Sequence, residues 1–402
     1  MASEFLLIGI DGGATKVSGW VVEYNAEEQS YQLTDQHAEM RYADIPGHIR
    51  DFRPLSLEVQ LGAFSKAEIS PTEDEVQQGM TYTKACAEVI KKLAQENPRY
   101  PILVGVGMPG LKTADRRGIA VVANGPRIPG YASDIEKYLL DSGLQMLAPI
   151  AHIGSDADYC GIGELYAHQG SFRNIKNAYY LGGGTGAADA LLIENVLIPF
   201  DQIKTWMAKT WELKNEQGRS MERYASASGL QFIYAERVGE TVENLTAEGI
   251  FPPQIAERAL EGDQHAAAAN LEAAENLAML FYERIATLYA GYQGQFQFVN
   301  PARQTLQTDH PYRGKHYDRI VVGQRLGDLM HSRAGKVVLT NPLVEKLENL
   351  IDSSDTLSEL IKEHYLHGRK LRNGRIYFSP LREAPALGAG IDASLTYHKS
   401  GS

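Results

Sequence analysis

A glycine-rich turn near the start of the chain carries residue types suited to binding a phosphorylated ligand. Residues 5–10 and 17–22 are apolar runs of strand length, and Asp11-Gly12-Gly13-Ala14-Thr15-Lys16 joins them. Two strands joined by a tight Gly-Gly turn form a β-hairpin, whose backbone N–H groups can approach an anion. Asp11 could hold Mg²⁺ through water, with the hydroxyl group of Thr15 and the cation of Lys16 nearby. An ordinary Asp-Gly turn explains the same residues equally well, and the spacing is not that of a P-loop.

A second glycine-rich turn has the same setting in the other half of the chain. Residues 178–181 are an expected strand, Gly182-Gly183-Gly184-Thr185-Gly186 follows, and residues 190–193 are the expected strand that leaves the turn. Each half therefore opens with a strand, a glycine turn and a strand. Because two such units facing each other can hold a nucleotide from both sides, a phosphate-binding role is favoured over a plain turn here.

Asp156 lies where an expected strand, residues 149–153, gives way to an expected helix, residues 156–168. Transfer of a phosphoryl group to an alcohol needs a carboxylate that accepts the hydroxyl proton, and Asp156 could supply it. Aspartate is also a favoured helix N-cap, and from the residues alone this structural role is preferred. Asp158 is interpreted as a first-turn carboxylate favoured by the helix dipole.

The elements that must position these residues alternate between strands and helices, which predicts an α/β fold with two domains. In the first half we expect a strand at 32–40, a helix with a capping box at 72–95, strands at 102–107 and 118–122, and a helix at 133–142. In the second half we expect helices at 230–260, 264–292, 342–352, 356–366 and 385–396, and strands at 319–323 and 376–378. The expected N-terminal domain is residues 1–153 with the closing helix 384–402, and the expected second domain is residues 154–383 with a polar insertion near 294–317.

Composition limits the classes of protein to which the chain can belong. Its 402 residues carry a net charge of −11, which argues against general binding to nucleic acid or to an anionic membrane. Cys86 and Cys160 are too few for a disulfide scaffold or a multi-cysteine metal site. The N-terminal apolar run is too short for a signal peptide and no window has the length of a membrane span, so we expect a cytoplasmic protein with reduced thiols.

Five segments, in order, resemble the ROK family, in the sugar-kinase branch of the actin–hexokinase–heat-shock ATPase superfamily. They are IGIDGGATK (8–16), VGVGMPG (104–110), SDADYCGIGE (155–164), LGGGTG (181–186) and APALGAG (384–390). The first segment is also similar to the branch of acyl-CoA-reductase activators and N-acetylglucosamine kinases, which is our second choice of family.

The resemblance implies two ribonuclease-H-like (actin-like ATPase) domains around a central cleft for nucleotide and sugar. It implies ATP-dependent phosphorylation of a hexose or N-acetylhexosamine hydroxyl, with Mg²⁺ held by Asp11 and Asp156 as the general base. The protein would have no nucleic-acid or membrane partner, and a homodimer is left open. The implied nucleotide-binding residues are Asp11, Gly12, Gly13, Thr15, Lys16, Gly184, Thr185, Gly186 and Gly323. The implied sugar-binding residues are Gly110, Asn124, Ser155, Asp156 and Glu222, where a turn residue beside Gly125 is the alternative for Asn124 and a helix cap the alternative for Glu222.

The chain lacks the Glu-x-Gly-His segment and the Cys-rich zinc loop of many ROK kinases. It has no histidine between His168 and His265 and no cysteine after Cys160. No zinc is therefore expected, and residues 204–221 must be held by packing, around Trp206 and Trp211.

The nucleotide-binding segments also depart from the family pattern. Ala187-Ala188-Asp189 stands where the second turn of the family continues with glycines, and Asp189 would repel phosphate if it points at the ligand. Gln324 follows Gly323 where the family has a second glycine, and Ser155 replaces the usual asparagine. The alternative function is therefore a catalytically weak or inactive sensor that binds nucleotide or sugar.

Overall fold

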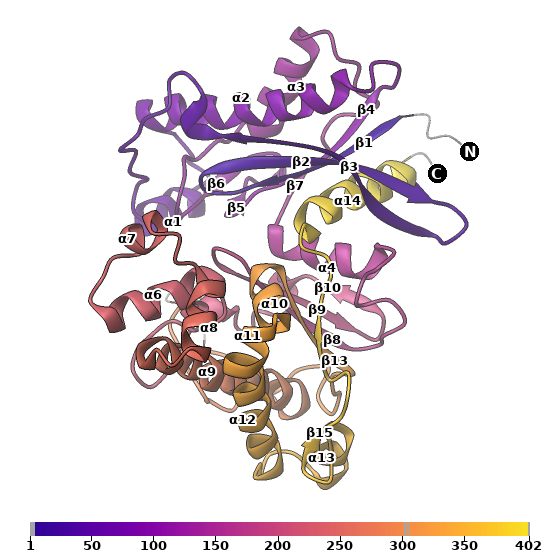
Figure 1. The fold of residues 1–402 in the computed structure, drawn as a ribbon. Helices are drawn as coiled ribbons and strands as arrows, with labels where there is room; N and C mark the ends of the chain where they lie inside the picture. Colours follow the sequence, from indigo (N-terminus) through magenta and orange to yellow (C-terminus); the bar gives the residue numbers. More distant parts are fainter. Residues whose placement is uncertain (1–4, 301–302, 304, 401–402) are drawn as a thin grey trace. The chain divides into compact units, whose positions relative to one another are not determined.

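The structure, a computed structural model, describes residues 5–300, 303 and 305–400 (Figure 1). The chain forms two compact units, one of residues 1–170 with 383–402 and one of residues 171–382. Each unit has its own hydrophobic core. The observed boundary differs from the expected one after residue 153, because the helix that begins at Asp156 belongs to the first unit.

The first unit is built on a mixed sheet with the strand order β3-β2-β1-β4-β7. The three strands β1, β2 and β3 are antiparallel, whereas β4 runs parallel to β1 and β7 runs parallel to β4. The bounds are β1 (Leu6–Gly12), β2 (Lys16–Asn25), β3 (Ser30–Arg41), β4 (Ile102–Gly107) and β7 (Ile153–Gly154), and a side hairpin joins β5 (Leu111–Lys112) to β6 (Ile119–Val121). The central strands β1 and β4 are apolar and buried, as strands covered on both faces must be.

Helices cover both faces of this sheet. Figure 1 shows α2 (Glu73–Gln95) and α3 (Tyr131–Asp141) on one face, and α4 (Asp156–Tyr166) and α14 (Ala384–Ser400) on the other, while α1 (Leu57–Ser65) packs near β6. A Cβ added to Gly9 or Gly105 would lie 1.9 Å from a carbonyl oxygen of α14, and one added to Gly388 would lie 1.9 Å from the carbonyl oxygen of Tyr159 in α4. These close approaches join α4 and α14 into one layer, which explains why the first unit continues beyond residue 153.

The second unit repeats the topology of the first. Its strand order is β10-β9-β8-β13-β16, with β8, β9 and β10 antiparallel and with β13 and β16 parallel to β8. The bounds are β8 (Ala178–Gly183), β9 (Ala187–Ile193), β10 (Val196–Ile198), β13 (Arg319–Gly323) and β16 (Ile376–Phe378). Both units are thus ribonuclease-H-like, which confirms the expected fold of two actin-like ATPase domains.

The helices of the second unit pack around α9 (Gln264–Ala290), whose inner face is buried in the core. The other helices are α5 (Phe200–Ile203), α6 (Ala227–Val238), α7 (Val242–Ala247), α8 (Pro252–Leu260), α10 (Gln324–His331), α11 (Arg333–Gly335), α12 (Asn341–Asp352) and α13 (Glu359–Tyr365). The single helix expected at 230–260 is wrong, because Gly239 and Gly249 adopt positive φ angles of 72° and Pro252 starts a new helix.

Two small hairpins complete the second unit. Part of the expected polar insertion forms β12 (Gln297–Phe298), which pairs with β11 (Leu213–Lys214), whereas residues 301, 302 and 304 lie outside the described residues. The other hairpin joins β14 (Leu366–His367) to β15 (Lys370–Leu371). Within the described ranges, no helix has the length and apolar character needed to cross a membrane.

Candidate functional site

The first glycine turn is a tight hairpin between β1 and β2. The N–H group of Gly13 donates to the carbonyl oxygen of Lys16 at 2.9 Å, and Asp11 lies opposite Ser18 at the end of β1. Gly12 packs so closely that an added Cβ would lie 1.9 Å from Sδ of Met108. The N–H groups of Ala14 and Thr15 have no hydrogen-bond acceptor among the described residues, and they are the donors that a bound anion would use.

Two stacked tyrosines, which the sequence analysis missed, hold this turn. The rings of Tyr42 and Tyr82 lie 3.6 Å apart, and their hydroxyl groups donate to the carbonyl oxygens of Gly13 at 3.2 Å and Ala14 at 2.8 Å. The N–H group of Tyr42 donates to the carbonyl oxygen of Thr15 at 3.1 Å. The carbonyl groups of the turn are therefore satisfied from within the protein. The signal could not be read from the sequence, because the two tyrosines lie far along the chain from the turn.

Lys16 forms an ion pair with Glu39 of β3, and the Ser18 hydroxyl group donates to the same carboxylate at 3.2 Å. The ion pair lowers the pKa of Glu39. The Lys16 side chain is half exposed, so its ammonium group could still contribute to binding an anion at the turn. In the structure, however, its hydrogen-bonding partner is a carboxylate.

Asp11 lies in an acidic environment made by two carboxylates from other parts of the first unit. Burial, together with the charges of Asp156 and Glu383, raises the pKa of Asp11 from 3.8 to about 7, and Lys16 opposes the shift. Asp156 is the first residue of α4, and the Ser155 hydroxyl group lies 3.4 Å from its Oδ1 atom. Glu383 immediately precedes α14. The structure therefore brings Asp11 and Asp156 together as expected and adds Glu383, whose only sequence signal was its position beside the APALGAG segment.

Asp11 is the residue of this group that could hold a hard divalent cation, through water. Carboxylate oxygens are the ligands that Mg²⁺ prefers in proteins, and burial together with the charges of Asp156 and Glu383 disfavours the ionised form of Asp11. A bound cation would relieve that repulsion.

Gly110 lies in a constrained turn of the first unit, whereas Asn124 lies in an exposed loop. Gly110 has a φ angle of +93°, and an added Cβ would lie 2.3 Å from the carbonyl oxygen of Val121, so the turn requires glycine. The Lys112 ammonium group donates to the carbonyl oxygens of Met108 and Gly110, both at 2.7 Å, and this fixes the turn. Asn124 is exposed in the loop after β6, and within the described residues no hydrogen bond links it to Asp11 or Asp156.

The second glycine turn joins β8 to β9 in the second unit. The N–H group of Gly184 donates to the carbonyl oxygen of Gly186 at 3.0 Å, and Thr185 and Gly186 are exposed. An added Cβ on Gly183 would lie 2.3 Å from Cβ of Leu326 in α10. The glycines therefore let α10 approach the turn.

Glu222 lies against this second turn. Its Oε1 atom accepts the N–H group of Ala187 at 3.1 Å and would lie 2.8 Å from a Cβ added to Gly186. One carboxylate oxygen thus takes a backbone donor at the start of β9.

Gln324 and Arg325, which follow Gly323, also lie at the second turn. Gln324 has a φ angle of 58°, which is uncommon for a residue other than glycine, and its Oε1 atom would lie 2.9 Å from a Cβ added to Gly184. The Arg325 guanidinium group donates to the Thr185 hydroxyl group at 3.0 Å. Burial and the nearby positive charge of Arg382 lower the pKa of Arg325. Sequence analysis missed Arg325, although it directly follows the Gly-Gln pair.

Asp189 points into the core and away from the second turn. It accepts hydrogen bonds from the Tyr179 hydroxyl group at 2.6 Å and from the Thr210 hydroxyl and N–H groups at 2.6 and 2.9 Å. The fully buried guanidinium group of Arg284 lies 3.4 Å away. The condition under which Asp189 would repel phosphate is therefore not met, because its carboxylate points into the core of the second unit.

Residues 204–221 are held by stacking and by polar contacts. Trp206 is buried and stacks on His310 at 3.9 Å, whereas Trp211 is 45% exposed, so only one of the two expected anchors packs in the core. The buried Glu212 carboxylate accepts the N–H group of Lys209 at 2.7 Å and pairs with Arg303.

Comparison with known proteins reveals similarity at the level of structure. No protein-family model and no curated protein matches the sequence. A ROK family glucokinase from Streptomyces griseus, solved with glucose and AMPPNP, is 16% identical with a TM-score of 0.56, and the match covers 97% of this chain and 99% of that one. Glucokinase from Parabacteroides distasonis is 16% identical with a TM-score of 0.54 and 99% coverage of both chains. A ROK family transcriptional regulator, a homologue of the Escherichia coli MLC protein, is 11% identical with a TM-score of 0.50, and the match covers 97% of this chain and 78% of that one. The expected resemblance is thus confirmed for the architecture: the chain has the fold of the ROK sugar kinases and of the regulators related to them.

Proposed function

We propose that the protein is an ATP-dependent kinase that phosphorylates a hydroxyl group of a hexose or N-acetylhexosamine. The observation that supports this most directly is the group of carboxylates around Asp11 and Asp156, which lies beside a hairpin turn with free N–H donors. The structural similarity to kinases such as the S. griseus glucokinase, solved with a sugar and an ATP analogue, agrees with it.

In the proposed reaction, Asp156 accepts the proton of the sugar hydroxyl group as its oxygen attacks the γ-phosphorus atom, and ADP leaves. The Ser155 hydroxyl group helps to orient the Asp156 carboxylate. Asp11 holds Mg²⁺, which when bound neutralises phosphate charge. The N–H groups of the first turn and residues 184–186 with Arg325 of the second turn bind phosphate oxygens. Gly323 lets the chain approach the nucleotide, and Gly110, Asn124 and Glu222 contact the sugar.

A sensor that binds ligand without turnover is the second candidate, and two contacts favour it. The Glu222 carboxylate takes the N–H group of Ala187, and the Gln324 side chain lies against Gly184. Both features reduce the donors and the space available to a phosphate at the second turn. A ROK regulator is also among the structures with this fold.

Coupled measurement of ADP release over a panel of hexoses and N-acetylhexosamines distinguishes the two candidates. For a kinase, one sugar should stimulate ADP release, and Asp156→Asn should lower kcat by about 10²–10⁴-fold while Mg-ATP still binds. The matched control is Asp158→Asn in the same first turn of α4, which should keep nearly normal kcat. If Mg-ATP binds but no sugar stimulates ADP release, the sensor is the correct function.

A further inference from the structure

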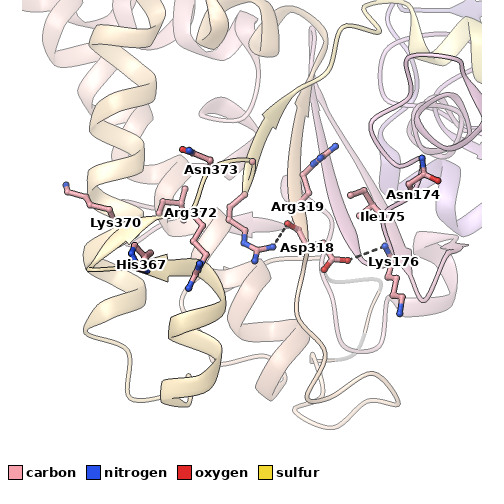
Figure 2. A pocket seen from close by; sticks show the side chains of 12 residues that line it. Asn174, Ile175, Lys176, Asp318, Arg319, His367, Lys370, Arg372 and Asn373 are labelled. Atoms are coloured by element: carbon pink, nitrogen blue, oxygen red, sulfur yellow. Dashed lines mark hydrogen bonds between the residues drawn. The ribbon is translucent and has the colours of Figure 1, made fainter.

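A pocket of about 990 Å³ lies at one end of the second sheet (Figure 2). Lys176 precedes β8, Arg319 begins β13 and Arg375 precedes β16, so the pocket is at the amino ends of three parallel strands. The β14–β15 hairpin and the turn that follows supply another wall. The second glycine turn begins where β8 ends at Gly183, so the pocket and that turn lie at opposite ends of the same strand.

This pocket, which we call the basic pocket, is strongly cationic in a chain with a net charge of −11. Its charged lining consists of five cations and one carboxylate, namely Lys176, Arg319, Lys370, Arg372, Arg375 and Asp318. The polar residues Asn174, His367 and Asn373 also line it, and Figure 2 shows that the labelled side chains come from three separate segments. Such a local excess of positive charge in an acidic protein favours binding of an anion.

Most of these cations lack a carboxylate partner. Among the described residues, only Lys370 of the five forms an ion pair, with Glu348 at 2.9 Å. Asp318, the one acid, uses its Oδ2 atom to accept the N–H group of Lys176 at 3.2 Å (Figure 2) and that of Asn177 at 3.0 Å. The charge of Asp318 is therefore engaged by the backbone, and it does not pair with the lysine and arginine side chains of the pocket.

The arginines are oriented without being neutralised. Arg375 donates to the carbonyl oxygens of Asp318 at 2.7 Å and His364 at 2.8 Å, and Arg372 donates to the carbonyl oxygen of Glu363 at 2.9 Å. Arg319 lies over the ring of Tyr377 at 4.5 Å, and its buried Nε atom has no hydrogen-bond partner among the described residues. Fixed guanidinium groups match phosphate oxygens well because they donate two parallel hydrogen bonds.

A metal ion is a poorer occupant of this region. His316, Asp318 and His364 offer ligand atoms within 4.8 Å of one another. However, Nε2 of His364 lies 2.9 Å from the carbonyl oxygen of Tyr317 and its Nδ1 lies 3.3 Å from the Arg375 guanidinium group. Both ring nitrogens of His364 are thus engaged, and a cation would lie beside Arg375.

We propose that the basic pocket is a second ligand site, which binds a small phosphorylated anion with at least two negative charges. The ligand would lie among the cations that line the pocket, at the opposite end of β8 from the turn assigned above to the nucleotide. This site is separate from the residues assigned to the proposed kinase reaction, so its ligand would be a regulator or a second anion rather than the nucleotide at the glycine turn.

Calorimetric titration with inorganic pyrophosphate, without Mg²⁺ and at constant ionic strength, tests the proposal. Lys176→Glu is the main variant, because its side chain is exposed and only its backbone N–H group holds Asp318. Arg372→Gln is the second variant. The matched control is Lys336→Glu, an exposed lysine of the same unit outside the pocket. Arg325→Gln removes the cation beside the second glycine turn and reports binding there.

We expect Lys176→Glu and Arg372→Gln each to weaken pyrophosphate binding at least tenfold, while Lys336→Glu and Arg325→Gln retain the affinity of the unmodified protein. Unchanged thermal unfolding without ligand confirms that the variants are folded. The proposal is overturned if the unmodified protein does not bind millimolar pyrophosphate. It is also overturned if the pocket variants bind as tightly as the control, or if Arg325→Gln alone abolishes binding.

Discussion

At the scale of single residues, Asp11 combines partial burial with two like charges. A shift of one pKa unit corresponds to about 1.4 kcal/mol, and the pKa of Asp11 is raised from 3.8 to about 7. The folded protein therefore holds this proton more tightly than the unfolded chain, and the ionised carboxylate is a local destabilising charge. Such a site gains from a cation, which is the physical basis for assigning Asp11 to Mg²⁺.

Asp11→Asn should accordingly raise the free energy of unfolding above neutral pH. Because the folded pKa lies above the unfolded one, the destabilisation is absent below pH 3.8, grows as the pH rises and is complete above pH 7. The gain at pH 8 should be about 1–4 kcal/mol, with the lower values reflecting partial solvent exposure. Urea unfolding at pH 4.5 and pH 8 measures it. Millimolar Mg²⁺ should stabilise the unmodified protein more than the variant, and a gain of equal size at both pH values would contradict the assignment.

The backbone of Gln324 is strained, because its φ angle of 58° suits glycine better than other residues. A left-handed backbone costs a residue other than glycine about 1–2 kcal/mol, and the Gln324 side chain also lies against Gly184. We expect Gln324→Gly to tighten Mg-ATP binding, because it clears the second turn. The matched control is Arg369→Gly on the exposed β14–β15 hairpin. Arg369 has a comparable φ angle of 64°, so glycine relieves similar strain there, and the affinity for Mg-ATP should not change. Calorimetric titration decides between these outcomes, and weaker binding by Gln324→Gly would show that the side chain itself contacts the nucleotide.

At the scale of elements, buried polar contacts hold the segment at residues 204–221. Arg303 pairs with Glu212, whose side chain is 2% exposed, so Arg303→Met would leave a buried carboxylate without its ion-pair partner. We expect it to destabilise the protein by about 3–5 kcal/mol. The control is Arg313→Met, which breaks an exposed pair with Asp309 in the same insertion and should cost less than about 1 kcal/mol.

Thermal unfolding of the Arg303 and Arg313 variants measures both losses of stability, and the same experiment on the unmodified protein addresses zinc. EDTA should leave the unfolding temperature of the unmodified protein unchanged. Stoichiometric zinc by elemental analysis, together with a large loss of stability in EDTA, would contradict the expectation.

Elements were predictable from the sequence where their signals are local. The capping box expected at the start of the 72–95 helix is present, since Thr72 and Glu75 exchange hydrogen bonds of 2.9 and 3.2 Å. Both glycine turns lie between the strands expected for them. The segment 230–260 was misassigned because its apolar pattern continues across glycines whose positive φ angles are visible only in the fold.

The candidate site was predictable only in part, for a related reason. Asp11, Asp156 and the glycine turns belong to contiguous motifs. Glu383 and the Tyr42–Tyr82 pair reach the first turn through tertiary packing, which no local pattern encodes. The inward orientation of the Asp189 side chain depends in part on Arg284, a buried residue nearly one hundred positions away in the chain.

At the scale of the whole molecule, the chain must reach its last helix before the first domain is complete. α14 is contributed by residues 384–400, yet it packs on β1, β4 and α4, so the first unit is discontinuous in sequence. The second unit, residues 171–382, is continuous. The two units therefore depend differently on the C-terminal segment, and a change in α14 should affect the stability of the first unit selectively.

Gly388→Ala tests this dependence. The added methyl group would lie 1.9 Å from the carbonyl oxygen of Tyr159, and since that atom belongs to the backbone, α14 or α4 must move. We expect a loss of at least about 3 kcal/mol in the unfolding of the first unit. Gly62→Ala, at an exposed position of α1 with no atom within 4 Å of the added group, should instead be neutral or stabilise by up to about 1 kcal/mol. Hydrogen exchange read separately over β1–β4 and over β8–β16 locates the effect. Faster exchange confined to the first set of strands agrees with the prediction, whereas equal acceleration in both sets would mean that the two units unfold as one and that α14 is not a selective support of the first.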